Sequence, residues 1–485
     1  MFQKLKELSK DTAIYGISTM VGRFLTFLLV PLYTNVFIES DYGVVSNIYI
    51  FIAIMNIVFV YGMDSSYLKF ASKIKIGDEK DNFSTPYLSV VIIGIILFCL
   101  IIILKPQLAV ILNIPQNYFY LFNYAAVILL VDALGVIPFI KLRIERKASK
   151  FATFKIINIC VNVGLNLYLI LILKLNIEAI FIANIGASAI TYLLLFPSVI
   201  QNLRFKINSD LLKSLLKFGL PYFPAGLGAI LIQGIDRPIL GHLTDLSTVG
   251  VYSANYKLGI FMMLFVSMFQ FAWQPFFLQN EDEKNAKELF SKVFTYFALV
   301  GSVVLVLISL FISDLVKINI FGHSIIGSAY WGGLHIVPVI LCGYLFYGFY
   351  VVFTAGIYIK EKSIYIPFIT LGGAVINIVS NFVLIPLIGI MGAAFSTLIS
   401  YLFMSVALYF VTQKFYNIKY EFLRVGKIFW GISVIAFIYY WNLDKGGLVL
   451  IYKFLLAVLF IIYIMIFVVD KQEIRVLKEK LFKSI

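Results

Sequence analysis

Long apolar stretches decide most of what this chain can become. The sequence contains about fourteen of them, most at least 18 residues long, which is enough for a helix to cross a roughly 30 Å hydrocarbon core. The bilayer offers no water to backbone groups and the stretches are too long for barrel strands, so we expect helices. The predicted spans are 12–36, 43–63, 87–104, 118–140, 156–173, 177–199, 218–236, 249–277, 293–313, 333–358, 364–386, 390–411, 428–443 and 447–469.

The positions of the basic residues predict the orientation of these spans. With the N-terminus in the cytoplasm, 31 of the 39 Lys and Arg residues fall in cytoplasmic segments and five fall in external loops. Because positive charge is retained on the cytoplasmic side, we expect both termini to be cytoplasmic. The net charge of +14 then lies beside anionic lipid and gives no reason to expect nucleic-acid binding.

A weak internal repeat predicts the domain organisation. Residues 42–46 resemble residues 249–253 at an offset of 207, and the pair Asn162 and Asn166 resembles Asn377 and Asn381 at an offset of 215. Six spans per repeat is an even number, so both repeats enter the membrane from the same side. An all-α membrane protein with two parallel six-helix lobes around a central cavity is therefore expected. We assign the lobes to 1–205 and 206–415, an appended helix pair to 416–470, and a cytoplasmic amphipathic tail to 471–485.

Three basic residues lie inside the predicted spans, namely Arg23, Lys257 and Lys453. A basic residue at the bilayer centre costs roughly 2.5–3.5 kcal/mol on insertion scales, so Arg23 in span 1 needs an acidic partner or a wet cavity. Arg23 is predicted either to form a structural ion pair or to contact a ligand. Lys257 in span 8 is predicted to contact a ligand or to extend to the interface. Lys453 lies outside the repeats and is expected to extend to the interface.

Acidic residues in the spans are the second group of candidates. Asp132, in the middle of span 4, is predicted to be either the ion partner of Arg23 or a protonatable switch, with H⁺ or Na⁺ as the coupling ion. Asp236 and Arg237 end span 7 at the expected outer mouth. They are predicted to form either a self-satisfied pair or a ring of charge that guards the cavity. The three histidines have no metal-ligand spacing, so no metal site is expected.

The sequence contains none of the common enzyme motifs that we looked for. It lacks a glycine-rich phosphate loop, a nucleophile elbow and a large soluble domain, so we expect a transporter with no catalytic residues and no cofactor. Two other classes stay open. A drug/cation antiporter would need more intramembrane acids, and a membrane glycan polymerase or ligase would need a long catalytic loop.

Several segments carry a family resemblance. They are residues 16–23 running to 39–43, residues 234–241 followed by 249–258, and residues 377–381 through 389–394. These segments resemble bacterial polysaccharide export flippases of the multidrug/oligosaccharidyl-lipid/polysaccharide (MOP) superfamily. The similarity covers essentially the whole chain; its motifs are moderately specific for the superfamily and weak for the substrate.

The resemblance implies a function and a site. Arg23 and Lys257 match the span 1 and span 8 cations of the similar lipid II flippases, which face the central cavity. Leu29 and Tyr256 depart from that branch, because a second arginine and an acid are expected there. The resemblance thus implies alternating-access flipping of another undecaprenyl-diphosphate-linked oligosaccharide, by a monomer in the bacterial inner membrane. Membrane lipid and other proteins of the polysaccharide pathway are the further partners it implies.

Overall fold

The computed structural model describes residues 20, 22, 24–25, 27–320, 322–443 and 447–470. Within these ranges 13 helices are long and apolar enough to cross a membrane. They correspond to predicted spans 2–14, which confirms an all-α polytopic membrane protein. Span 1 lies partly outside the described residues and is represented mainly by α2 (Leu29–Val36). The tail 471–485 also lies outside them.

By backbone packing the chain forms two compact units, each built from separate stretches of sequence. The described part of Met1–Ile260, with Ile326–Gly333 and Ile364–Ser400, makes the first unit; Phe261–Ile325, Leu334–Ser363 and the described part of Tyr401–Ile485 make the second. The units are defined by backbone packing, whereas the predicted lobes, 1–205 and 206–415, are defined by the sequence repeat. The lobe boundaries therefore stay a prediction.

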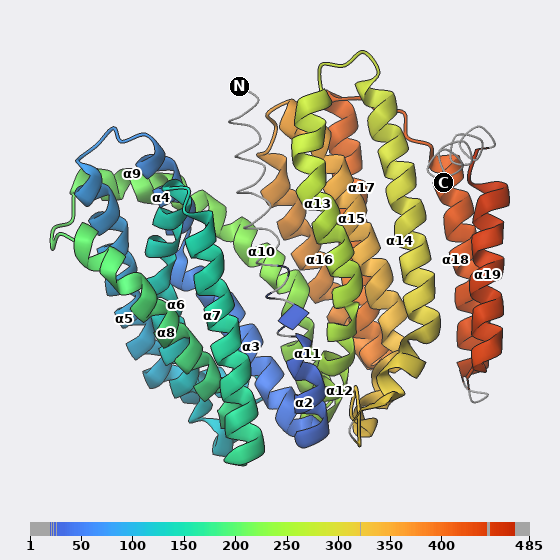
Figure 1. Cartoon of the computed structure of the whole chain (residues 1–485), viewed down its shortest axis with the longest axis horizontal. Coiled ribbons are helices and arrows are strands. Elements are labelled where there is room, and N and C mark those ends of the chain that lie inside the picture. The colour runs from blue at the N-terminus through green and yellow to red at the C-terminus, as the bar shows by residue number, and fades with distance from the viewer. Residues whose placement is uncertain are drawn as a thin grey trace. The chain divides into compact units, whose positions relative to one another are not determined.

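The first unit contains most of the helices (Figure 1). After α2 these are α3 (Glu39–Val60), α4 (Met63–Ser72), α5 (Glu79–Ile111), α6 (Leu121–Ile144), α7 (Ala148–Leu167), α8 (Glu178–Asn202), α9 (Ser209–Gly219), α10 (Phe223–Gly234), α11 (Asp236–Leu243), α12 (Leu246–Tyr256) and α16 (Tyr365–Ile388). Short helical turns are η1 (Gln116–Tyr118), η2 (Tyr168–Ile172), η3 (Leu220–Tyr222), η4 (Lys257–Gly259) and η5 (Ser328–Ile336). In this unit α6 packs against α5 and α8, and α8 packs against α7.

The second unit is built around α14 (Ala286–Lys317), which packs against α15 (Val337–Ile359), α18 (Phe422–Leu443) and α19 (Leu450–Phe467). Helices α13 (Ile260–Asn280) and α17 (Ile390–Phe415) each run across a unit boundary. A two-residue hairpin pairs β1 (Asn319–Ile320) with β2 (His323–Ser324).

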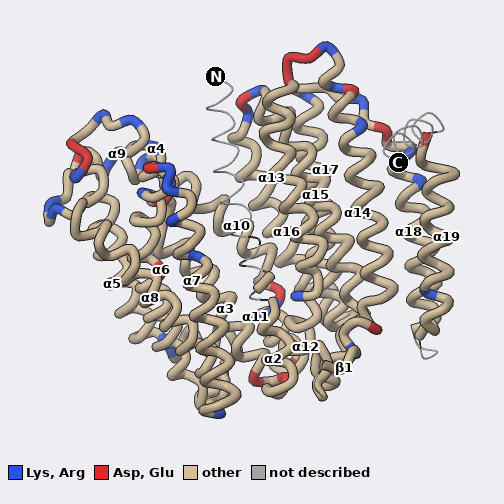
Figure 2. The backbone as a smooth tube through the Cα atoms, viewed as in Figure 1, with Lys and Arg blue, Asp and Glu red and all other residues tan. Residues whose placement is uncertain are grey.

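Charged residues gather at the helix ends, and the middle of most helices is almost free of them (Figure 2). Helix starts are fixed by side chains that accept a backbone hydrogen bond: Asp78 caps α5, Asn208 caps α9 and Asp245 caps α12. Lys453 lies in the first turn of α19, is only 4% exposed and forms an ion pair at 2.6 Å with Asp314, which is near the end of α14. Its ammonium group therefore reaches a carboxylate at a helix end, and its extension to the interface stays a prediction.

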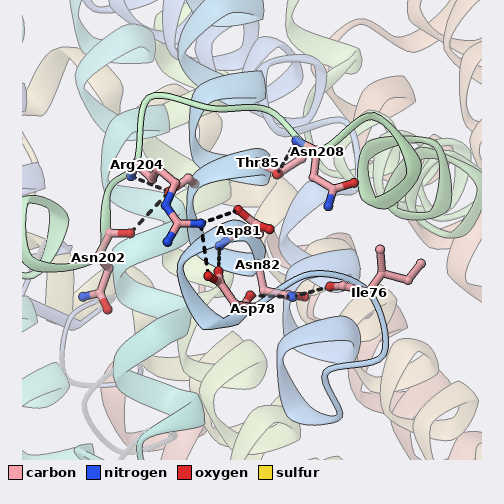
Figure 3. A network of polar contacts seen from close by, with 9 residues as sticks. Ile76, Asp78, Asp81, Asn82, Thr85, Asn202, Arg204 and Asn208 are labelled. Atoms are coloured by element: carbon pink, nitrogen blue, oxygen red, sulfur yellow. Dashed lines mark hydrogen bonds and ion pairs between the residues drawn. The ribbon is translucent and has the colours of Figure 1, made fainter.

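The segment between α8 and α9, where the predicted lobes join, is attached to the start of α5 (Figure 3). The Arg204 guanidinium forms ion pairs with Asp78 at 3.0 Å and Asp81 at 3.2 Å, and the Arg204 backbone N–H donates to the Ser84 hydroxyl at 2.7 Å. The backbone N–H of Asp81, together with Arg204, holds the pKa of the Asp78 carboxyl below its usual value. The connection between the predicted lobes is therefore anchored to the first unit.

The repeat appears in the structure as a reciprocal crossing of α3 and α12. A Cβ atom on Gly43 would overlap the carbonyl group of Leu246, and a Cβ atom on Gly250 would overlap the carbonyl group of Glu39. The two contacts are equivalent under the offset of 207 that the sequence repeat shows, because that offset relates Gly43 to Gly250 and Glu39 to Leu246. The two helices thus approach backbone to backbone, with equivalent residues on each side, as a local two-fold axis requires.

We expect Gly43→Ala to lower the free energy of unfolding by about 1–3 kcal/mol, because the added methyl group must push α3 and α12 apart. Gly164→Ala is the matched control. Gly164 lies within α7 with no atom near its absent Cβ, so alanine there is expected to be neutral or to stabilise by up to about 1 kcal/mol. Thermal unfolding of the purified variants measures both, and equal melting temperatures for the two would contradict the tight crossing.

Candidate functional site

Arg23 lies outside the described residues, but its flanking sequence shows which helix span 1 meets. A Cβ atom on Gly22 would be 3.0 Å from Cδ1 of Ile159 in α7. Further along the chain, the Tyr33 hydroxyl donates to Oδ1 of Asn166, also in α7, at 2.8 Å. Span 1 therefore packs along one face of α7 at both of these points.

Lys257 lies on η4, a 3₁₀ turn that joins α12 to α13. Its side chain is exposed, and its ammonium group donates to the Tyr42 hydroxyl at 2.7 Å and lies 5.1 Å from the centre of the Tyr42 ring. Tyr42 is only 1% exposed and packs edge-on against Tyr330 at 5.8 Å. Lys257 is therefore held by a buried tyrosine at the α3–α12 crossing, next to Gly43.

Tyr42 is a site residue that sequence reasoning missed. It stands in the repeat segment and was used there only as evidence of internal similarity. The signal that could have identified it is its position beside Gly43, because a helix crossing at a glycine brings the neighbouring side chain against the other helix.

Asp132 is half-buried on α6, and its carboxylate accepts a hydrogen bond from the Ser188 hydroxyl of α8 at 2.6 Å. Two helical turns further along α6, the Phe139 ring lies with its centre 4.5 Å from the ammonium group of Lys155 on α7. Lys155 lies two turns into α7, which begins at Ala148 and belongs to a helix that is long and apolar enough to cross a membrane.

Asp236 and Arg237 form a buried ion pair at the start of α11. Their charged groups are 3.0 Å apart, Asp236 has no exposed surface and Arg237 is 7% exposed. The Tyr252 hydroxyl donates to the second carboxylate oxygen of Asp236, and the Arg237 guanidinium lies 4.4 Å from the Tyr256 ring centre. Both charges therefore have partners within the first unit.

The described part of the chain contains no group of three or more His, Cys, Asp or Glu residues that could hold a metal ion. The site residues found there thus fall into three separate places: Lys257 with Tyr42, Asp132 with Ser188 and Lys155, and the pair Asp236 and Arg237. The lysine side chains of the first two places are exposed, whereas both residues of the third are buried.

We expect Arg237→Gln to destabilise the protein by about 3–5 kcal/mol, because it leaves the Asp236 carboxylate buried without its counter-charge. The double variant with Asp236→Asn removes both charges and should recover most of this loss. Thermal unfolding of the two variants beside the wild type measures the difference. If the two residues instead formed a ring of charge at an open cavity mouth, neither variant should change the melting temperature much. That result would argue against a structural pair.

Comparison with known proteins assigns the chain to a family. A sequence profile described as "Polysaccharide biosynthesis protein" matches residues 34–324, which is more than half of the 485 residues. None of the curated proteins matches the sequence significantly.

Solved structures resemble the chain over most of its length. One is "Lipid II flippase MurJ, inward closed conformation", with a TM-score of 0.75 and 16% identity over 94% of this chain and 98% of that chain. Another is an inward-facing multidrug resistance MATE family transporter, with a TM-score of 0.62 and 13% identity over 84% of this chain and 98% of that chain. At such identities the likeness shows the fold. With its matched profile over more than half of its residues, the chain belongs to the polysaccharide biosynthesis protein family.

Proposed function

We propose that this protein is a flippase that moves an undecaprenyl-diphosphate-linked oligosaccharide from the cytoplasmic to the outer leaflet, for O-antigen, capsule or exopolysaccharide synthesis. One observation carries the proposal: an exposed lysine, Lys257, is held inside an apolar span by a buried tyrosine in a member of a polysaccharide biosynthesis family. The MurJ-like fold supports the proposal, since that relative is named as a flippase of a lipid-linked substrate.

The proposed substrate explains why a cation should lie within the membrane span. A diphosphate is anionic, and a lysine or arginine away from bulk water forms its strongest hydrogen bonds to such groups. Lys257, together with Arg23 in span 1, holds the diphosphate while the isoprenoid tail stays in lipid. The two lobes then alternate access between the cytoplasmic and outer sides.

The direction of transport follows from the proposed orientation. With both termini cytoplasmic in the inner membrane and the inside negative, moving an anion outward is favourable by roughly 2.3 kcal/mol per charge per 100 mV. A monomer suffices for this mechanism, and other membrane proteins of the polysaccharide pathway would receive the exported unit.

An ion-coupled drug/cation antiporter is the second candidate, and the fold shared with MATE transporters favours it. Such a transporter binds cationic substrates, so it needs free acids in the span. The described acid Asp236 is neutralised by Arg237, which leaves Asp132 as the clearest candidate acid in the described spans. The balance of charge therefore favours an anionic substrate. A glycan polymerase or ligase is a weaker candidate, tested by whether purified protein lengthens or transfers glycan.

Asp132 is also our candidate for H⁺ or Na⁺ coupling, because it is a half-buried carboxylate in mid-span. If coupling occurs there, Asp132→Asn should abolish the dependence of transport on the pH or Na⁺ gradient. Transport by the variant in proteoliposomes, with and without each gradient, measures this. Full transport with an unchanged gradient dependence would exclude Asp132 as the coupling site.

The flippase proposal predicts the outcome of a flipping assay in proteoliposomes that carry a lipid-diphosphate oligosaccharide. We expect the wild type to move headgroups across the bilayer, and Arg23→Ala and Lys257→Ala each to reduce the rate at least about tenfold by removing a charged contact. Lys213→Ala, which removes an exposed lysine from α9, is the control and should keep the wild-type rate.

A wild type that moves no headgroups but carries a cationic dye under an ion gradient would replace the flippase with the antiporter. Thermal unfolding of each variant separates a lost substrate contact from a misfolded protein.

A further inference from the structure

Lys155 is a charged residue inside a membrane span that lacks an ion pair in the described part of the chain. It lies on α7, seven residues after the helix begins, and its side chain is exposed. Its ammonium group is 4.5 Å from the centre of the Phe139 ring on α6. A lysine in a span is costly and is retained where it pairs, meets water or binds a ligand.

The face of α7 that carries Lys155 is directed toward span 1. Lys155, Ile159 and Asn166 follow one another at helical spacing, four and then seven residues apart, so they share one side of the helix. Ile159 meets Gly22, the residue before Arg23 in the chain, and Asn166 accepts a hydrogen bond from Tyr33. Lys155 therefore lies one turn from the point where α7 meets span 1, toward the predicted cytoplasmic end.

Asp132 stands seven residues, or two helical turns, before Phe139, so it lies on the same side of α6 as the ring that the Lys155 ammonium group contacts. Lys155 and Asp132 form no ion pair within 4 Å, and the Asp132 carboxylate accepts a hydrogen bond from the Ser188 hydroxyl instead. The ammonium group is thus attracted by the carboxylate without being bound to it. Its long, flexible side chain leaves it free to take a stronger anionic partner.

We propose that Lys155 is an anion-binding residue that receives the diphosphate group of the lipid substrate in the cytoplasmic half of the span, with Asp132 as its counter-charge when the site is empty. The inference rests on the proposed flippase function and adds a third cation to Arg23 and Lys257. A charge-assisted contact to a phosphate oxygen is stronger than the distant attraction of Asp132, so the ligand displaces the carboxylate as partner. Asp132 then competes with the ligand for Lys155.

This competition predicts opposite effects of two neutralising substitutions. Lys155→Gln should weaken binding of a lipid diphosphate by about tenfold or more, because one charged contact is lost. Lys155→Arg should keep most of the affinity, since the charge remains. Asp132→Asn should strengthen binding several-fold, because the competing carboxylate is gone. Lys150→Gln, an exposed lysine at the start of the same helix, is the control and should leave binding unchanged.

The test uses the full-length protein in nanodiscs, with farnesyl diphosphate as the probe and inorganic pyrophosphate as the comparison. Binding is measured by titration calorimetry, and the thermal unfolding of each variant is measured in parallel. If Lys155→Gln fails to fold, Lys155→Met is the second neutral variant, because it keeps an apolar stem of similar length. Farnesyl diphosphate should bind at least about tenfold more tightly than pyrophosphate, because its tail is buried in lipid.

The possible failures are distinguishable. If the wild type binds farnesyl diphosphate and Lys155→Gln binds it equally well, the role of Lys155 is wrong and the proposed flippase function stands. If Lys155→Gln and Asp132→Asn both lower the melting temperature and both weaken binding, the two residues are a structural pair and the inference is overturned. Equal affinity for pyrophosphate would overturn the assignment to a lipid ligand. A wild type that neither binds the probe nor flips headgroups would overturn this inference and the proposed function together.

Discussion

The absence of water inside a bilayer is the constraint on which the rest of this structure depends. It forces the apolar stretches to form helices, and it makes each charge within them costly unless a partner lies nearby. The described charges meet that condition in different ways. Asp236 and Arg237 are buried against each other, and Lys453 reaches Asp314. Lys257 instead donates a hydrogen bond to the Tyr42 hydroxyl, a neutral partner that an anionic ligand can replace or supplement.

Close backbone packing occurs where two of these helices cross. Gly43 and Gly250 let α3 and α12 approach so closely that no side chain fits between them, and the repeat places the two glycines symmetrically. Tyr42, next to Gly43, is carried by this crossing to the ammonium group of Lys257. The backbone contact that joins the repeat-related helices therefore also positions a candidate binding residue.

The sequence predicted the fold well because hydrophobicity is read from local composition. The thirteen described spans match the predicted ones, and the family match confirms that the chain belongs to a polysaccharide biosynthesis family. Site prediction was weaker. The contacts of Lys453 with Asp314 and of Lys257 with Tyr42 were not predicted, because a sequence does not say which neighbour a long side chain meets.

The sequence by itself determined that this chain is a polytopic helical membrane protein with few charges inside its spans, since burial in lipid depends on residue type alone. Only the tertiary structure decided how those charges are satisfied. The pairing of Lys453 with Asp314, the contact of Lys257 with Tyr42, and the contact of Lys155 with the Phe139 ring each join residues on different helices. Such contacts depend on the register and rotation of packed helices, which local sequence patterns leave open.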